Sequence, residues 1–129
     1  MKPADDASPS RLPTISLIFV YGTLKRGQVR HFALAGQRLL GDAKSRPRYR
    51  MVNLGSYPAL IEGGASAIAG ELWEVDATCL ALLDEIESVA EAYYRRGEIL
   101  LAPPHDDLIV EAYFFDADVS SLPDHGEVW

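Results

Sequence analysis

The residue whose type and place most clearly suggest chemistry is Glu87, at the end of the predicted helix 77–87. Successive residues of an α-helix are rotated by about 100°, so Leu80 and Leu83 lie on one apolar face. Glu87 falls at about 340° when Leu80 is set at zero, between these two leucines. Glu85 falls at about 140°, away from the apolar face. The spacing therefore predicts that one carboxylate, Glu87, points with the core side chains.

A carboxylate in this position has two costs. Partial burial raises its pKa, and the helix dipole disfavours negative charge near the C-terminus. Neither cost helps folding, so the position favours a functional role, such as accepting and returning a proton. The alternative is that the helix ends near Ile86 and that Glu87 turns out into solvent.

A second candidate feature is the sequence FVYGTLKRG at residues 19–27. The apolar run 15–21 predicts a buried strand, which breaks at Gly22. A glycine turn at a strand end leaves backbone N–H groups unpaired, and such groups can hold a carboxylate or a developing oxyanion. The alternative is an ordinary strand end followed by a turn.

Other residue types give weaker indications of a functional site. His31, His105 and His125 are widely separated and show no metal-ligand spacing, so we expect no metal and no cofactor. The sequence contains no G-x-S-x-G, P-loop or G-x-G-x-x-G pattern. Arg95 and Arg96 could bind a substrate carboxylate, although a solvated strand edge is the stronger interpretation for at least one of them.

Composition restricts the class of protein. The chain has 129 residues, 48% of them apolar, which fits one domain with a real core. Its net charge of -7 disfavours nucleic acid and anionic membranes as partners. Cys79 is the single cysteine, so no internal disulfide can form. With no apolar run of about 18 residues and no apolar leader near the N-terminus, we expect a cytoplasmic protein.

The elements that must position these residues follow from periodicity and turn signals. Residues 1–14 are predicted to form a mobile tail, and residues 15–129 are predicted to form a single domain. Asp76 is the expected N-cap of helix 77–87. Tyr57, held extended by Pro58, suits the edge of a pocket. Strands are predicted at 15–21, 39–43, 49–54, 67–75, 94–101 and 108–115, a short helix at 29–34 with Phe32 facing inward, and a loop at 55–60. Because helices do not alternate regularly with strands, we expect an α+β fold with a mixed sheet of five to seven strands that curls into a β-barrel-like form, flanked by two or three short helices.

Four segments resemble the γ-glutamylcyclotransferase-like family, in its AIG2-like or γ-glutamylamine cyclotransferase branch. The resemblance covers about residues 18–115. It differs from the larger glutathione-type branch, which reads Y-G-S-N at the first loop, and this disfavours glutathione-type substrates. The four segments are VYGTLKRG at 20–27, GSYPAL at 55–60, GELWEVD at 70–76 and LLDEIE at 82–87.

The resemblance implies a function. Active family members release 5-oxoproline from γ-glutamyl compounds, and Glu87 matches the family's catalytic glutamate. Residues Tyr21, Gly22, Thr23 and Leu24 would bind the γ-glutamyl unit of a small-molecule substrate, with Tyr57 and Tyr94 as pocket walls. The alternative is a non-catalytic module that binds a γ-glutamyl or amino-acid-like ligand, and a transferase or lyase acting on a γ-glutamyl intermediate would use the same residues. The leaving amine and the oligomeric state stay open.

Overall fold

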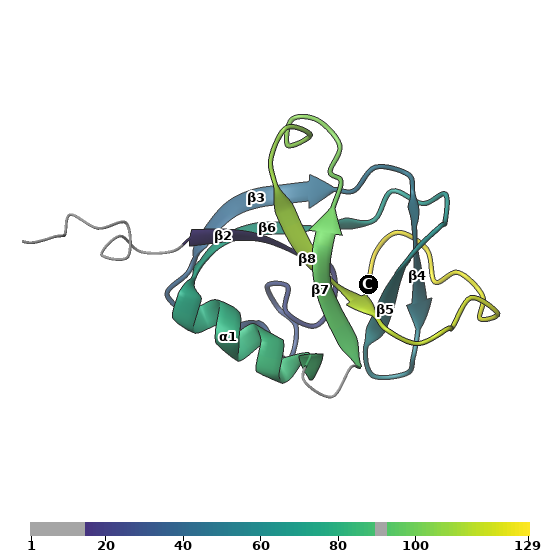
Figure 1. Ribbon diagram of the computed structural model, residues 1–129, viewed down its shortest axis with the longest axis horizontal. Helices are drawn as coiled ribbons and strands as arrows, with labels where there is room; N and C mark the ends of the chain where they lie inside the picture. The colour runs from purple at the N-terminus through teal and green to yellow at the C-terminus, as the bar shows by residue number, and fades with distance from the viewer. Residues whose placement is uncertain (1–14, 90–92) are drawn as a thin grey trace, which may run out of the picture.

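The structure is a computed structural model that describes residues 15–89 and 93–129 (Figure 1). The predicted tail 1–14 lies outside the described residues. A five-stranded sheet in the order β3-β6-β2-β8-β7 and a separate hairpin of β4 and β5 make up the strands. The elements are β2 (Ile15–Val20), the 3-10 helix η2 (His31–Leu34), β3 (Arg38–Lys44), β4 (Tyr49–Asn53), β5 (Pro58–Glu62), β6 (Ala69–Asp76), α1 (Ala77–Ile86), β7 (Tyr94–Ile99) and β8 (Val110–Phe115).

Strand β2 lies in the middle of the sheet and is covered on both faces. It pairs with β6 in antiparallel register and with β8 in parallel register. Ile18 and Val20 pack on the side of α1 and η2, whereas Phe19 packs on the side of the β4–β5 hairpin. A strand buried on two faces needs a continuous apolar run, which explains why 15–21 shows no polar alternation.

The expected closure into a barrel is not observed. Among the described residues, the edge strands β3 and β7 meet through one antiparallel bridge, between Ser45 and Leu101 beyond the ends of the two strands. Figure 1 shows β7 and β8 crossing the direction of β2 and β6 steeply. This strong twist separates the two edges along most of their length, so the mixed α+β sheet stays open.

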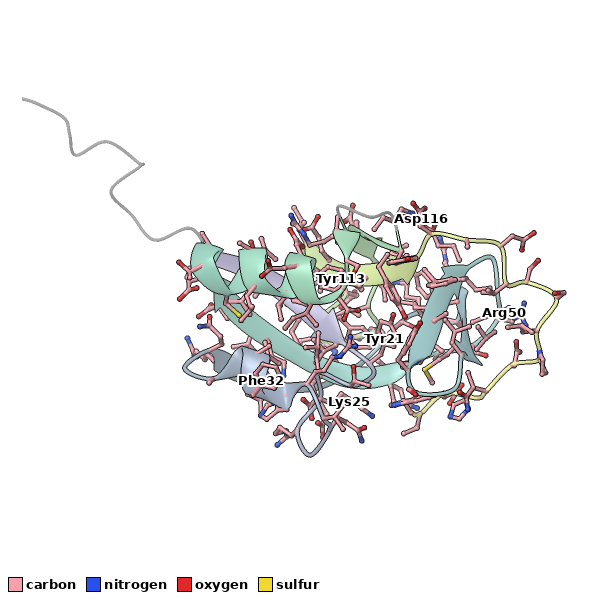
Figure 2. All side chains as sticks on the ribbon, turned by 90° about the horizontal axis from the view of Figure 1, so that it is seen from below. Tyr21, Lys25, Phe32, Arg50, Tyr113 and Asp116 are labelled. Carbon is pink, nitrogen blue, oxygen red and sulfur yellow. The ribbon has the colours of Figure 1, made fainter. Side chains whose placement is uncertain are left out.

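Some local predictions were also wrong. The short helix predicted at 29–34 is present as the 3-10 helix η2, but α1 is the one α-helix among the described residues, so the helix count differs from the two or three helices expected. In η2, Ala33 and Leu34 are buried, whereas Phe32 is exposed and not inward-facing (Figure 2). The predicted loop 55–60 contains the start of β5, because Pro58 is the first residue of that strand, a place that tolerates proline.

The start of α1 agrees with the prediction. Asp76 adopts an extended conformation, and its side chain accepts a hydrogen bond from the Cys79 N–H at 2.8 Å. Cys79 itself is buried, as a small apolar side chain. The helix has ten residues, and within the part of the chain that the structure describes no helix has the length and apolarity that crossing a membrane requires.

We expect Asp76→Ala to lower the free energy of unfolding by about 1 kcal/mol, because the N-terminal N–H groups of α1 lose their side-chain acceptor. Asp76→Asn keeps an acceptor oxygen and is the matched control. Chemical denaturation of the three proteins measures the difference. Equal stability of Asp76→Ala and the wild type would show that the cap contributes nothing here.

Candidate active site

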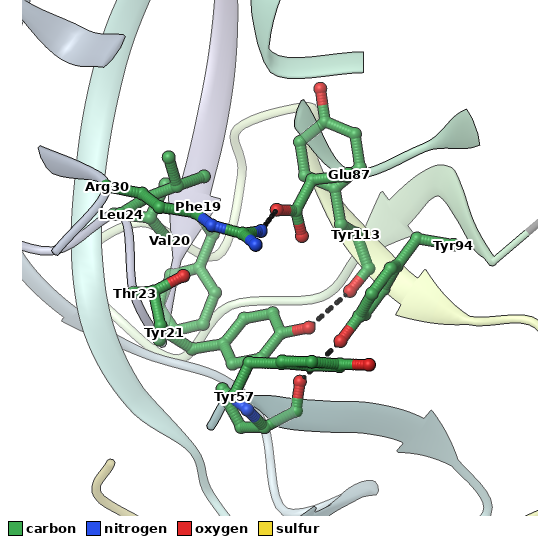
Figure 3. A pocket seen from close by; sticks show the side chains of 12 residues that line it. Phe19, Val20, Tyr21, Thr23, Leu24, Arg30, Tyr57, Glu87, Tyr94 and Tyr113 are labelled. Atoms are coloured by element: carbon green, nitrogen blue, oxygen red, sulfur yellow. Dashed lines mark hydrogen bonds and ion pairs between the residues drawn. The ribbon is translucent and has the colours of Figure 1, made fainter. Parts of the chain in front are cut away.

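A pocket opens where β2 ends, between the loop that follows β2, the end of α1 and the start of β5 (Figure 3). The pocket holds about 360 Å³ of empty space when the part that is open to solvent is included. The seven residues that the sequence predicted as site residues all line it, although their roles stay predictions. The lining is formed by Phe19, Val20, Tyr21, Gly22, Thr23, Leu24, Arg30, Tyr57, Pro58, Glu87, Tyr94 and Tyr113.

The loop after β2 turns tightly. The Lys25 N–H donates to the Gly22 carbonyl at 3.1 Å, and the Arg30 N–H donates to the Thr23 carbonyl at 2.9 Å. A Cβ atom at Gly22 would lie 2.6 Å from Cγ of Pro58, closer than real contacts allow. Gly22 is therefore required by the approach of β5 to the loop, a long-range contact that the sequence did not reveal.

The loop also contains backbone donors without an acceptor in the described part of the protein, in residues that line the pocket. The N–H groups of Gly22, Thr23 and Leu24 have no hydrogen-bond acceptor among the residues that the structure describes. Thr23 and Leu24 are buried, so these polar groups are largely removed from solvent. Buried N–H groups without a partner are uncommon in proteins, and an anion bound in the pocket would satisfy them.

Glu87 reaches the pocket from the end of α1. The helix ends at Ile86, and Glu87 is the C-cap, with its N–H donating to the Leu83 carbonyl at 2.9 Å. The helical turn thus continues through Glu87, and its side chain keeps the direction that periodicity predicts. It is 11% exposed. The alternative in which Glu87 turns out into solvent is therefore wrong, although the helix does end at Ile86.

The environment of Glu87 changes its acidity. Burial raises the pKa of the Glu87 carboxyl from 4.5 to about 7. The Arg30 guanidinium opposes this, because it lowers the same pKa through an ion pair with Nη1 3.5 Å from Oε2 of Glu87. A carboxyl with a pKa near 7 can both accept and donate a proton around neutral pH.

Tyrosines form the other walls (Figure 3). The Tyr21 hydroxyl donates to the Tyr113 carbonyl at 2.6 Å, and the Tyr94 hydroxyl donates to the Pro58 carbonyl at 2.7 Å. The Tyr57 ring lies at the open side, 37% exposed, with its centroid 6.4 Å from that of Tyr94. Burial raises the pKa of both Tyr21 and Tyr94, so their hydroxyls stay protonated and hold the pocket wall in place.

Sequence reasoning missed five lining residues, among them the polar residues Arg30 and Tyr113. Tyr113 lies in β8, in the interior between α1 and the hairpin (Figure 2), and its hydroxyl donates to Oδ1 of Asp84 in α1 at 2.6 Å. Asp84 also accepts from Nε of Arg96 at 2.9 Å. This chain of contacts fixes α1 against the sheet and thereby positions Glu87. Tyr113 lies within the predicted strand 108–115, but no local sequence signal placed it at the pocket.

The two arginines considered for a substrate carboxylate lie elsewhere. Arg96 pairs with Asp84 and Glu111, and Arg95 pairs with Glu62. Neither lines the pocket. Within the described ranges, no group of three or more His, Cys, Asp or Glu residues is placed to hold a metal ion.

Comparison with known proteins identifies relatives over most of the chain. The family described as gamma-glutamyl cyclotransferase, AIG2-like, matches residues 18–129. A Vibrio cholerae protein named "Putative gamma-glutamylcyclotransferase" is 44% identical over 79 residues, which cover 61% of this chain and 68% of that protein. A protein of Escherichia coli strain K12, named a gamma-glutamylcyclotransferase family protein, is 30% identical over 110 residues, or 85% of this chain and 93% of the relative.

A solved structure agrees with this result. The crystal structure of a mouse AIG2-like protein superposes with a TM-score of 0.77 and 27% sequence identity. The match covers 89% of this chain and 88% of the mouse protein. The open mixed sheet with its single helix in the described residues is thus a fold shared with that protein.

Proposed function

The chain belongs to the AIG2-like γ-glutamyl cyclotransferase family, and from this membership we propose that it is an enzyme that releases 5-oxoproline from a γ-glutamyl amine or γ-glutamyl peptide, with Glu87 as general acid and base. One observation carries the proposal. A buried carboxylate whose pKa is about 7 faces a loop with unpartnered backbone N–H groups in one pocket.

The proposed reaction is an intramolecular acyl transfer. The substrate's α-ammonium gives a proton to Glu87, and the free amine attacks the γ-carbonyl carbon of the same molecule. A five-membered lactam ring forms, and the bond from the γ-carbon to the leaving nitrogen breaks as Glu87 returns its proton to that nitrogen. The ionised Glu87 then accepts the second proton from the ring nitrogen and passes it to the departing amine, which leaves as an ammonium ion. Because nucleophile and electrophile belong to one molecule, little entropy is lost on ring closure. The reaction as proposed needs no metal, no cofactor and no covalent enzyme nucleophile.

The loop supplies the second element of the proposed mechanism. The N–H groups of Gly22, Thr23 and Leu24 would bind negative charge on the substrate, either its α-carboxylate or the oxyanion on the γ-carbonyl. The hydroxyl groups of Tyr21 and Tyr94 donate hydrogen bonds to protein carbonyls. They therefore act in this proposal as rigid walls that exclude water rather than as proton donors to the substrate.

The test is a direct assay of the product. Purified protein is given γ-glutamyl-lysine, γ-glutamyl-alanine and glutathione, and 5-oxoproline is measured by chromatography. We expect release from at least one substrate, with glutathione the poorest. If γ-glutamyl compounds raise the melting temperature but none is consumed, the protein is a binding module and the proposed activity is wrong.

A further inference from the structure

Arg30 is the feature of the pocket that the proposed mechanism leaves unused. Among the described residues that line the pocket, Arg30 is the one cation and Glu87 the one carboxylate. A basic side chain beside a catalytic base needs an explanation, because it lowers the pKa of the group whose basicity the reaction requires.

The chain holds Arg30 in a defined place. Its N–H donates to the Thr23 carbonyl at 2.9 Å, and its own carbonyl accepts from the Ala33 N–H at 3.1 Å. The arginine is thereby tied at its backbone both to the loop after β2 and to the 3-10 turn η2. Its guanidinium extends across the pocket toward Glu87 (Figure 3).

Burial shows on which side of the pocket Arg30 lies. The Arg30 side chain is 39% exposed, whereas that of Glu87 is 11% exposed. The guanidinium therefore lies toward the open side and the carboxylate beneath it. In a pocket that holds the γ-glutamyl unit against the loop 22–24, the open side is where the leaving group projects.

Electrostatics then connects Arg30 to the leaving group. Glu87 must come within hydrogen-bond reach of the leaving nitrogen to protonate it. If the leaving group is an amino acid, its carboxylate is one carbon away from that nitrogen and close to Glu87. Two carboxylates at such a distance in a partly buried site repel each other unless a cation lies between them. The N–H groups of 22–24 would be available to the γ-glutamyl unit's own α-carboxylate, so that group does not require Arg30.

We propose that Arg30 is the residue that determines leaving-group specificity: it binds the carboxylate of the departing amino acid, so the preferred substrates are γ-glutamyl amino acids rather than γ-glutamyl derivatives of simple amines. This inference rests on the proposed cyclotransferase activity. It assigns the class of the leaving group, which the sequence left open.

The test uses two substrates of nearly equal size, γ-glutamyl-alanine and γ-glutamyl-alaninamide, which differ in one charge. The measured quantity is the ratio of their kcat/KM values for 5-oxoproline release. We expect the wild type to prefer γ-glutamyl-alanine by about tenfold or more, because a hydrogen bond to a charged partner is lost with the amide. In Arg30→Gln the ratio should fall by about the same factor, and Arg30→Lys should keep part of it.

The chain offers a matched control in Arg38. It also pairs with a glutamate, with its Nη1 3.6 Å from Oε1 of Glu74, but it lies outside the pocket. Arg38→Gln should leave the ratio at its wild-type value. Equal loss on both substrates in Arg30→Gln, or a wild type without preference, would overturn the assignment of Arg30 alone. A wild type that releases 5-oxoproline from neither substrate, nor from any other γ-glutamyl compound, would overturn the proposed activity and this inference with it.

Discussion

Replacing Glu87 by glutamine is expected to lower kcat for 5-oxoproline release by about 10²- to 10⁴-fold, the usual contribution of a positioned acid or base. Glutamine has nearly the size of glutamate and keeps two polar atoms. However, it can neither take the proton of the substrate's α-ammonium nor return one to the leaving nitrogen. The loss should appear in kcat and not only in KM, because the group acts in the chemical step.

The control for this substitution lies two residues earlier on the same helix. Glu85 is exposed and does not line the pocket, so Glu85→Gln removes the same charge without touching the site. We expect its kcat to equal that of the wild type. Circular dichroism of both variants establishes that they fold. A folded Glu87→Gln protein that turns over substrate at the wild-type rate would show that the proton is moved by another group.

Glu87 could be found from the sequence because its position depends on local geometry alone. The 100° step of an α-helix carries the apolar stripe of Leu80 and Leu83 up to Glu87 without any tertiary information. Asp76 marks where that helix begins, and its capping hydrogen bond is present in the structure. The burial of strand 15–21 could also be predicted from local sequence, because the strand is a run of apolar residues.

Arg30 and Pro58 could not be found in this way, because their places depend on contacts between distant segments. Arg30 lies in a loop without periodicity that also contains the basic residues Lys25 and Arg26, and nothing local distinguishes it. Pro58 was predicted to lie in a loop, whereas it is the first residue of β5 and its ring packs against Gly22. Closure of the sheet likewise depends on twist summed over five strands, which no short segment encodes.

Stability should also depend on pH through Glu87, in a direction opposite to that of most carboxylates. The folded-state pKa of about 7 lies above the unfolded value of 4.5, so the folded protein binds the proton more tightly. The contribution of Glu87 to stability is therefore fully present below pH 4.5. It is lost as the pH rises to about 7, because ionisation then occurs in a buried site.

The size of the effect follows from the two pKa values. Each pH unit between them costs about 1.4 kcal/mol, so about 3 kcal/mol is lost over the whole window. Glu87→Gln imitates the protonated acid and does not titrate. The variant's stability relative to the wild type should therefore be constant below pH 4.5, increase between pH 4.5 and 7, and be constant again above pH 7.

Urea denaturation of both proteins at closely spaced pH values from 4 to 9 measures this difference. Other carboxylates titrate alike in the two proteins and cancel, and Tyr21, Tyr94 and Tyr113, whose pKa values are raised by burial, stay neutral throughout. Glu85→Gln should show no such step. A difference that stays flat across the range would mean that the Glu87 carboxyl is as well solvated in the folded protein as in the unfolded chain. In that case its pKa would lie near 4.5, too low for the proton transfers proposed for it.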